Sequence, residues 1–102
     1  MHTIEEEQIH QAQRDIKNLG PERTLIRMEE SDQGIVVSIY DTLDGHERLL
    51  VLEGLPFIEP DWRCAEILLA QLLGLRRTRD KIKTQIRIER LPDEHPLASG
   101  EV

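Results

Sequence analysis

The chain has 102 residues, which leaves room for one domain with one hydrophobic core. Its formal net charge of −7 disfavours non-specific attraction to nucleic acid or anionic lipid, and no apolar run approaches the roughly 20 residues that span a bilayer. A single cysteine, Cys64, excludes an intramolecular disulfide and, with an N-terminus unlike a signal peptide, predicts a cytoplasmic protein.

Basic residues are concentrated in residues 76–90, which we call the basic segment. Seven Lys and Arg residues stand there against two acidic residues, which gives the segment a charge of +5 and leaves −12 for the rest of the chain. The segment either neutralises acidic neighbours within the fold or a dimer, or binds phosphate groups or an acidic partner. The candidate contact residues are Arg76, Arg77, Arg79, Lys81, Lys83 and Arg87.

The first predicted element is a helix over residues 3–19. Thr3 and Glu6 have the spacing of a capping box, in which two side chains satisfy backbone N–H groups at the start of a helix. Gly20 and Pro21 predict its end, because glycine adopts the left-handed conformation easily and proline cannot continue a helix. The apolar stripe that recurs at helical spacing consists of Ile9, Ala12, Ile16 and Leu19.

Three strands are predicted next, over residues 23–30, 35–41 and 46–53. Their alternating and β-branched side chains favour extended structure, and the turns at 31–34 and 42–45 each contain a glycine that can close a tight loop. Two short turns in succession predict an antiparallel meander. The second and third strands are apolar on both sides, so we expect both faces of an antiparallel sheet to be covered.

The second predicted helix begins near Pro60 or Asp61, since proline suits the first turn of a helix. Its side chains leave only a narrow polar strip, which is typical of a buried helix. Gly74 either ends this helix or interrupts it. The apolar positions that define the helix are Ala65, Ile67, Leu68, Leu69, Leu72 and Leu73.

Residues 76–91 fit two patterns. Isoleucine and threonine alternate there with polar side chains, which predicts a strand, but some of these apolar residues also fit a helical stripe. We favour a helix to about residue 79 and a strand over residues 81–90. The fold prediction is therefore one α+β domain over residues 1–91 in the order α-β-β-β-α-β, followed by a flexible tail over residues 92–102.

The chain contains no recognisable catalytic or metal-binding motif. The four histidines are not spaced as metal ligands, and the cysteine has no partner thiol. Asp41, Asp44 and His46 form the most site-like cluster, but aspartate and glycine also suit a tight turn. Cys64 and His46 could act as nucleophile and base, although a cysteine in an apolar helix is more often a small buried residue. We therefore predict no enzyme, no cofactor and no metal.

Phe57 and Trp62 are two of the three aromatic residues and lie in and beside an apolar connection. They either cover the core between the sheet and the second helix or form an exposed anchor for a partner, because aromatic residues are favoured in protein interfaces. Both alternatives are open from the sequence. Phe57 and Trp62 therefore join the basic segment as candidate partner-binding residues.

The predicted order of helix, three-stranded meander and helix resembles that of double-stranded-RNA-binding domains and covers residues 3–75. That family has a basic start to its second helix, whereas the corresponding residues here are Asp61-Trp62-Arg63-Cys64, so the resemblance is one of topology. The same order followed by a further strand is similar to the small acidic chaperones of bacterial type III secretion, which dimerise and wrap secretion substrates. Both likenesses concern the order of elements, and neither assigns the chain to a family.

The excess of apolar surface predicts a homodimer formed through the second helix or through an open face of the sheet. Together with the lack of a catalytic set, it favours a non-catalytic cytoplasmic protein that binds a protein partner as an adaptor, a chaperone-like binder or an inhibitor. The alternative is nucleic-acid binding through residues 76–90. A small enzyme built around Cys64, or around Asp41, Asp44 and His46, is the third hypothesis, and no membrane association is expected.

Overall fold

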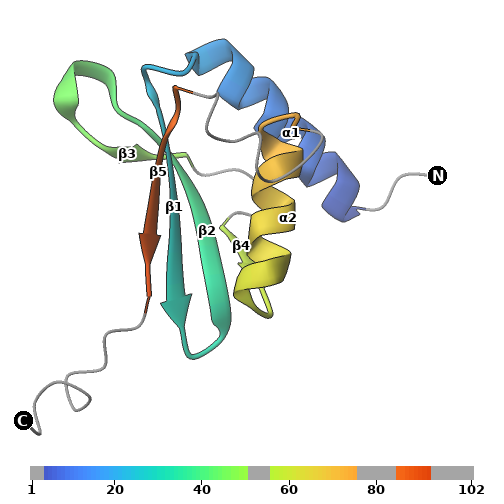
Figure 1. The fold of residues 1–102 in the computed structure, drawn as a ribbon. Helices are drawn as coiled ribbons and strands as arrows, with labels where there is room; N and C mark the ends of the chain where they lie inside the picture. The colour runs from blue at the N-terminus through green and yellow to red at the C-terminus, as the bar shows by residue number, and fades with distance from the viewer. Residues whose placement is uncertain (1–3, 51–55, 76–84, 93–102) are drawn as a thin grey trace, which may run out of the picture.

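The computed structural model describes residues 4–50, 56–75 and 85–92. Within them, two helices pack on one face of a five-stranded mixed sheet (Figure 1). The predicted α+β class and the order α-β-β-β-α-β are confirmed, and one short strand before the second helix is added. The elements are α1 (Ile4–Leu19), β1 (Thr24–Ser31), β2 (Gly34–Asp41), a 3₁₀ turn (Leu43–Gly45), β3 (Arg48–Leu49), β4 (Phe57–Glu59), α2 (Trp62–Leu72) and β5 (Arg87–Leu91).

Helix α1 places its apolar stripe against the core. Ala12 and Ile16 are buried, and Ile9 is half-buried beside them. The helix ends as predicted before Gly20, whose φ is +83° and whose N–H donates to the carbonyl of Ile16 at 3.0 Å. The predicted cap at Thr3 lies outside the described residues.

Strands β1 and β2 form an antiparallel hairpin closed by a two-residue turn. The pairing runs from Thr24 opposite Asp41 to Ser31 opposite Gly34. Gly34 has a φ of +128°, which residues with a Cβ rarely adopt, and the hydroxyl of Ser31 donates to its carbonyl at 2.9 Å. The prediction that this glycine closes the turn is confirmed.

Strands β3 and β4 share the outer edge of β2. β4 pairs with Ile35–Val37, and β3 pairs with the last residues of β2. The predicted start of the third strand at His46 is wrong. The N–H of His46 still donates to the carbonyl of Leu43 in the 3₁₀ turn at 3.2 Å, so the strand begins only at Arg48. Residues 51–53 of that prediction lie outside the described residues, and β4 itself is not predicted from the sequence.

β5 lies at the other edge of the sheet and pairs in parallel with β1, so the strand order is β3-β2-β1-β5. The expected antiparallel meander of β1, β2 and β3 is confirmed, and β5 makes the sheet a mixed one. β4 and β5 run in the same direction because α2 joins them as a crossover, which carries the chain from the outer edge of β2 to the opposite edge of the sheet beside β1. The strand begins at Arg87; Gln85 and Ile86 are not part of it, and residues 81–84 of the prediction lie outside the described residues.

Both ends of α2 are fixed by local hydrogen bonds. Asp61 caps the start, where its carboxylate accepts the N–H of Cys64 at 2.8 Å. Gly74 has a φ of +67°, and its N–H and the N–H that follows donate back to carbonyls in the last turn. This Schellman motif ends the helix at Leu72. An unbroken helix through residues 73–75 is therefore wrong, and the predicted helical residues 76–79 lie outside the described residues.

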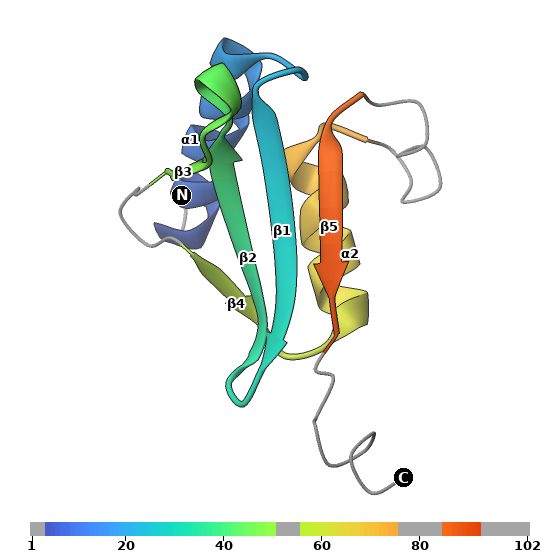
Figure 2. The same cartoon turned by 90° about the vertical axis from the view of Figure 1, so that its left-hand side faces the viewer.

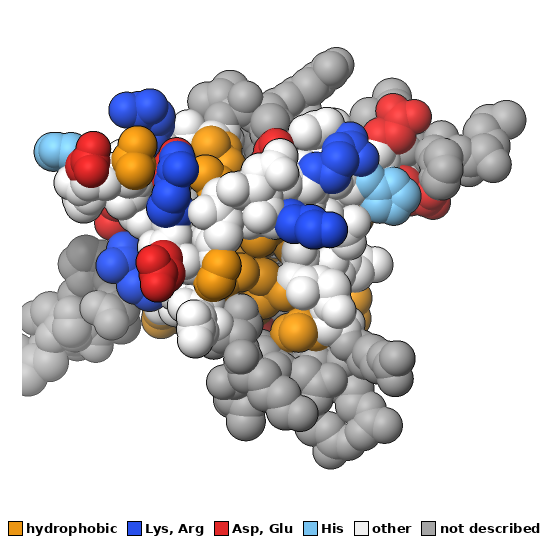
Figure 3. All heavy atoms as spheres, turned by 90° about the horizontal axis from the view of Figure 1, so that it is seen from above, with side chains coloured by type: hydrophobic (Ala, Val, Ile, Leu, Met, Phe, Trp, Pro, Cys, Tyr) orange, Lys and Arg blue, Asp and Glu red, His pale blue; other side chains and the backbone are white. Residues whose placement is uncertain are grey.

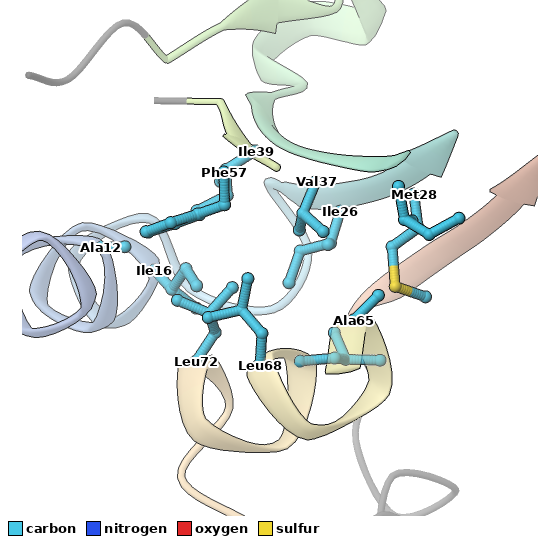
Figure 4. Packing of buried hydrophobic residues seen from close by; sticks show 12 residues of the cluster. Ala12, Ile16, Ile26, Met28, Val37, Ile39, Phe57, Ala65, Leu68 and Leu72 are labelled. Atoms are coloured by element: carbon cyan, nitrogen blue, oxygen red, sulfur yellow. The ribbon is translucent and has the colours of Figure 1, made fainter. Parts of the chain in front are cut away.

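The hydrophobic core lies between the sheet and the two helices. Figure 4 shows side chains of the sheet pointing toward those of α1 and α2. The prediction that the second helix is buried is confirmed, since most of its apolar side chains are inaccessible to solvent. The buried members of the core are Ala12, Ile16, Ile26, Met28, Ile35, Val37, Ile39, Phe57, Ala65, Leu68, Leu69 and Leu72.

Both described helices cover the same face of the sheet (Figures 1 and 2). The expectation that both faces are covered holds, among the described residues, only around Leu25, which is fully buried on the other face opposite Tyr40. Val36 and Tyr40 are half-buried on the other face, and Ile58 is exposed there. Neither described helix is long and apolar enough to cross a membrane.

Candidate functional site

The face of the sheet that turns away from α1 and α2 is the candidate functional site, and we call it the open sheet face (Figure 2). Successive side chains of a strand point to opposite faces, so every second residue of the strands lies on it. Five large hydrophobic side chains are exposed among the described residues. Three of them, Leu49, Ile58 and Leu91, have exposures of 42%, 48% and 41% and stand on this face. Several exposed large apolar side chains on one face favour a contact surface.

The apolar side chains occupy the two ends of the open sheet face. At one end, Leu49 lies opposite Tyr40. At the other end, Ile58 lies opposite Val36, and Leu91 belongs to the same row on β5, where the exposed Glu29 of β1 stands between it and Val36. The two rows are four residues apart along β2, which is roughly 13 Å in a strand. A partner can therefore contact two separate apolar areas on one surface.

A set of ion pairs fills the space between the two apolar ends. Arg27 donates from Nε to Glu89 Oε1 at 2.7 Å and from Nη2 to Glu47 Oε1 at 2.9 Å. Its guanidinium also lies 4.6 Å from the ring centroid of Tyr40. The hydrogen bonds to Glu89 and Glu47 raise the pKa of Arg27, so this centre stays charged. Arg87 adds a longer contact, 3.8 Å from Nη2 to Glu47 Oε2.

The predicted cluster of Asp41, Asp44 and His46 is divided by the structure. Asp41 is buried and accepts hydrogen bonds from Arg23 Nε at 3.1 Å and Nη2 at 2.6 Å. It also accepts the N–H of Leu43 at 3.0 Å, which anchors the 3₁₀ turn. Asp44 and His46 are exposed, and Asp44 supplies the left-handed conformation of the turn, with a φ of +58°. The presence of both aspartates is therefore explained by the turn itself, since Asp41 anchors it and Asp44 adopts its left-handed conformation.

Stability should depend on pH through Asp41. The hydrogen bond from Arg23 holds the pKa of Asp41 below its ordinary value, so folding favours the carboxylate. Its contribution is present above the ordinary aspartate pKa of about 3.9 and is lost as the pH falls through the lower pKa of the folded state. We expect Asp41→Asn to lower the melting temperature at neutral pH, and the difference from wild type to shrink below about pH 4.

Thermal unfolding followed by circular dichroism over this pH range measures the effect. Asp44→Asn is the matched control, because Asp44 is exposed in the same turn and asparagine also tolerates its backbone conformation. This control should follow the wild type much more closely. If the melting temperatures of Asp41→Asn and wild type differ by the same amount at every pH, the ion pair with Arg23 is not the cause of that difference.

Cys64 is not arranged as an activated nucleophile. The hydrogen bond to the carboxylate of Asp61 and, next, burial raise the pKa of the Cys64 thiol, which keeps it protonated. Figure 1 places the start of α2 far from the turn before β3, which contains His46, so the predicted nucleophile and base are not brought together. Among residues 4–50, 56–75 and 85–92, no three His, Cys, Asp or Glu side chains are grouped to hold a metal ion.

The predicted partner-binding residues fall in different places. Phe57 is 5% exposed and belongs to the core, whereas Trp62 is half-buried, with Nε1 3.5 Å from Glu30 Oε1. Arg87 is exposed on the open sheet face. The remaining predicted residues, which lie outside the described ranges, are Arg76, Arg77, Arg79, Lys81 and Lys83.

Neither the ion-paired residues Arg27, Glu47 and Glu89 nor the apolar and aromatic residues of the open sheet face are predicted as site residues from the sequence. Tyr40 and Leu49 did give a signal, since strands apolar on both sides expose one side when only one face is covered. Ile58 belongs to the apolar connection, but the sequence predicts no strand there and therefore assigns Ile58 to no face of the sheet. Leu91 was placed at the end of the domain and not on a face of the sheet.

A groove of about 410 Å³ lies between the last turns of the two helices. Figure 3 looks onto this end of the molecule and shows hydrophobic side chains near the middle, with charged side chains on both sides. The chain between Leu75 and Gln85 joins the walls of the groove and is not described, so the groove carries no functional proposal. Its lining residues are Gln13, Ile16, Lys17, Leu72, Leu73, Gly74 and Ile86.

Comparisons of the chain with protein-family models, with curated proteins and with solved structures find no match. Its function is therefore inferred from the open sheet face itself.

Proposed function

We propose that this chain is a non-catalytic cytoplasmic protein that binds a protein partner through the open sheet face, as an adaptor, a chaperone-like binder or an inhibitor. The observation that carries the proposal is the grouping there of Leu49, Ile58 and Leu91, each more than 40% exposed. A partner that covers apolar surface gains about 25 cal/mol for each Å² removed from water. The exposed side chains are therefore a source of binding energy that folding leaves unused.

The layout of the face indicates what a partner must present. Its surface needs two apolar areas roughly 13 Å apart to cover the two ends. Between them it needs polar groups, because Arg27, Glu47 and Glu89 keep their charges and lose water when they are covered. Tyr40 is held under the Arg27 guanidinium, so little conformational freedom is lost when it is contacted.

Aspartate at either apolar end should disrupt binding. The test captures partners from an extract of the native source with immobilised wild-type protein and with the Ile58→Asp and Leu49→Asp variants. We expect the proteins bound by wild type to fall roughly tenfold or more with these variants, because a charge in a covered apolar contact must be desolvated. The matched control is Ile67→Asp, which puts the same charge on an equally exposed isoleucine of α2, at 49% exposure.

Circular dichroism on each variant checks that the fold is retained, which is expected because all three side chains are exposed. Binding that survives both Ile58→Asp and Leu49→Asp would refute the open sheet face as the site. Loss of binding with Ile67→Asp alone would place the contact on the outer side of α2 instead.

Nucleic-acid binding through the basic segment is the alternative, and the described residues give it less support. Arg90 donates from Nε to Glu66 Oε1 at 2.7 Å, and Arg87 is 3.8 Å from Glu47. These two arginines thus have acidic partners within the fold, as the neutralising interpretation of the segment expects. Binding to nucleic acid would be recognised by a steep loss of affinity as the salt concentration rises.

A further inference from the structure

β5 is the last strand at one edge of the sheet, and no other described strand pairs with its outer side (Figure 2). An edge strand presents N–H and C=O groups that can pair with a strand of another chain. Charged side chains normally oppose such pairing, and β5 carries Arg87, Glu89 and Arg90. The order of these charges, however, makes the strand complementary to itself.

We propose that two copies of this chain pair antiparallel through β5, with Ile88 opposite Ile88 of the second copy, to form one continuous sheet. In this register, Arg87 of each copy lies opposite Glu89 of the other. Arg87 can make the contact because its side chain is 63% exposed and its ion pair with Glu47 is long, at 3.8 Å. Glu89 is 35% exposed and is held in place by Arg27 at 2.7 Å.

The order of charged residues in β5 favours pairing centred on Ile88 over pairing shifted by one residue in either direction. Pairing centred on Arg87 or on Glu89 would bring that residue against its own copy, and a parallel arrangement would bring like charges together along the strand. Centring on Ile88 places opposite charges together on both sides of it. The twofold axis then stands perpendicular to the sheet, so the helices of both copies lie on one side and both open sheet faces on the other.

This pairing goes beyond the proposed function and does not depend on it. Leu49 and Ile58 lie on strands at the outer edge of β2, so β2 and β1 separate them from β5. Pairing of two short strands buries less surface than a standard interface, so we expect a dissociation constant of about micromolar size. The dimer would place two open sheet faces side by side.

The test compares wild type with Arg87→Glu and with Arg48→Glu by light scattering at roughly 100 µM, well above the expected dissociation constant. Arg48→Glu is the matched control, because it makes the same charge change on an exposed residue at the opposite edge of the sheet. Wild type and Arg48→Glu should have twice the monomer mass. Arg87→Glu should dissociate about tenfold or more readily, since two attractive contacts become repulsive.

Mixing two variants tests the register. Glu89→Arg alone should also weaken the dimer, because it sets Arg87 against a second arginine. A mixture of Arg87→Glu with Glu89→Arg should restore it, since both contacts in the mixed dimer again join opposite charges. Failure of the two folded variants to associate would overturn the register.

A cross-linking measurement covers the case in which Glu89→Arg does not fold, because that variant also loses the contact with Arg27. With Cys64→Ser in place, Ile88→Cys should form a disulfide-linked dimer on oxidation. Leu91→Cys should not, since its two copies would be roughly 20 Å apart in this register.

Equal cross-linking by both variants overturns the proposal, as does a monomeric wild type or an Arg87→Glu variant with unchanged mass. A monomer that still needs Ile58 to capture its partner would overturn this pairing alone and leave the proposed function standing.

Discussion

Replacing Phe57 with alanine should lower the free energy of unfolding by about 3–5 kcal/mol, the usual cost of removing a buried phenylalanine ring. Phe57 is 5% exposed, and its ring points from β4 toward α1 in Figure 4. Removing it leaves a cavity between the sheet and that helix. Chemical denaturation measures the loss directly, and the melting temperature should fall by about 12 °C or more.

Ile58→Ala is the matched control for this change. Ile58 is the next residue of the same strand, is 48% exposed and points to the opposite face, so its truncation should change stability by roughly 0.5 kcal/mol or less. The pair also decides between the two alternatives for Phe57. A Phe57→Ala protein of unchanged stability that had lost its partner would identify the ring as an interface anchor and contradict the core assignment.

Alanine at Gly34 should cost about 3 kcal/mol or more, because it combines an unfavourable backbone conformation with a steric clash. A Cβ at this position would overlap the carbonyl oxygen of Glu59 at the end of β4. Gly34 also has a φ of +128°, which alanine adopts only with strain. We expect β4 to be pushed away from the hairpin turn, and thermal and chemical unfolding to show the loss of stability.

Gly20→Ala separates the two contributions to that effect. Gly20 also has a positive φ, +83°, but nothing lies within 4 Å of the position that its Cβ would take. Only the conformational cost of about 1–2 kcal/mol should remain. Equal losses for Gly20→Ala and Gly34→Ala would contradict the close packing of β4 against the turn.

The sequence predicts those helix ends and turns that depend on residues close together in the chain. The end of α1 at Gly20 and the turn closed by Gly34 depend on local backbone conformation, which glycine permits directly. The buried character of α2 follows from its composition. Its end also has a local signal, because Gly74 adopts the left-handed conformation and completes a Schellman motif.

The remaining part of the fold depends on contacts between distant residues. β4 has only three residues between Pro56 and Pro60, and it is a strand because the edge of β2 is available to pair with it. The direction of β5 is set by the crossover through α2 and not by its own sequence. No local pattern carries either kind of information.

The candidate site could also be predicted only in part from the sequence. Alternation placed Tyr40 and Val36 on one side of the second strand, but only the packing of both helices on one face shows which side stays open. Phe57 and Ile58 make the difference plain. Phe57 has the residue type that is favoured in interfaces but is buried, whereas its neighbour Ile58 is the one that the fold exposes.

The long separation between β1 and β5 has a consequence for how the chain is made. Arg27 and Glu89 are 62 residues apart, whereas β1 reaches β2 through a two-residue turn. Contacts that close long stretches of chain form more slowly than local ones, so the hairpin can assemble well before β5 arrives. During synthesis, β1 therefore has one unpaired side until the ribosome has released the chain through Leu91. A nascent or C-terminally shortened chain would present that side to chaperones or to other unfinished copies.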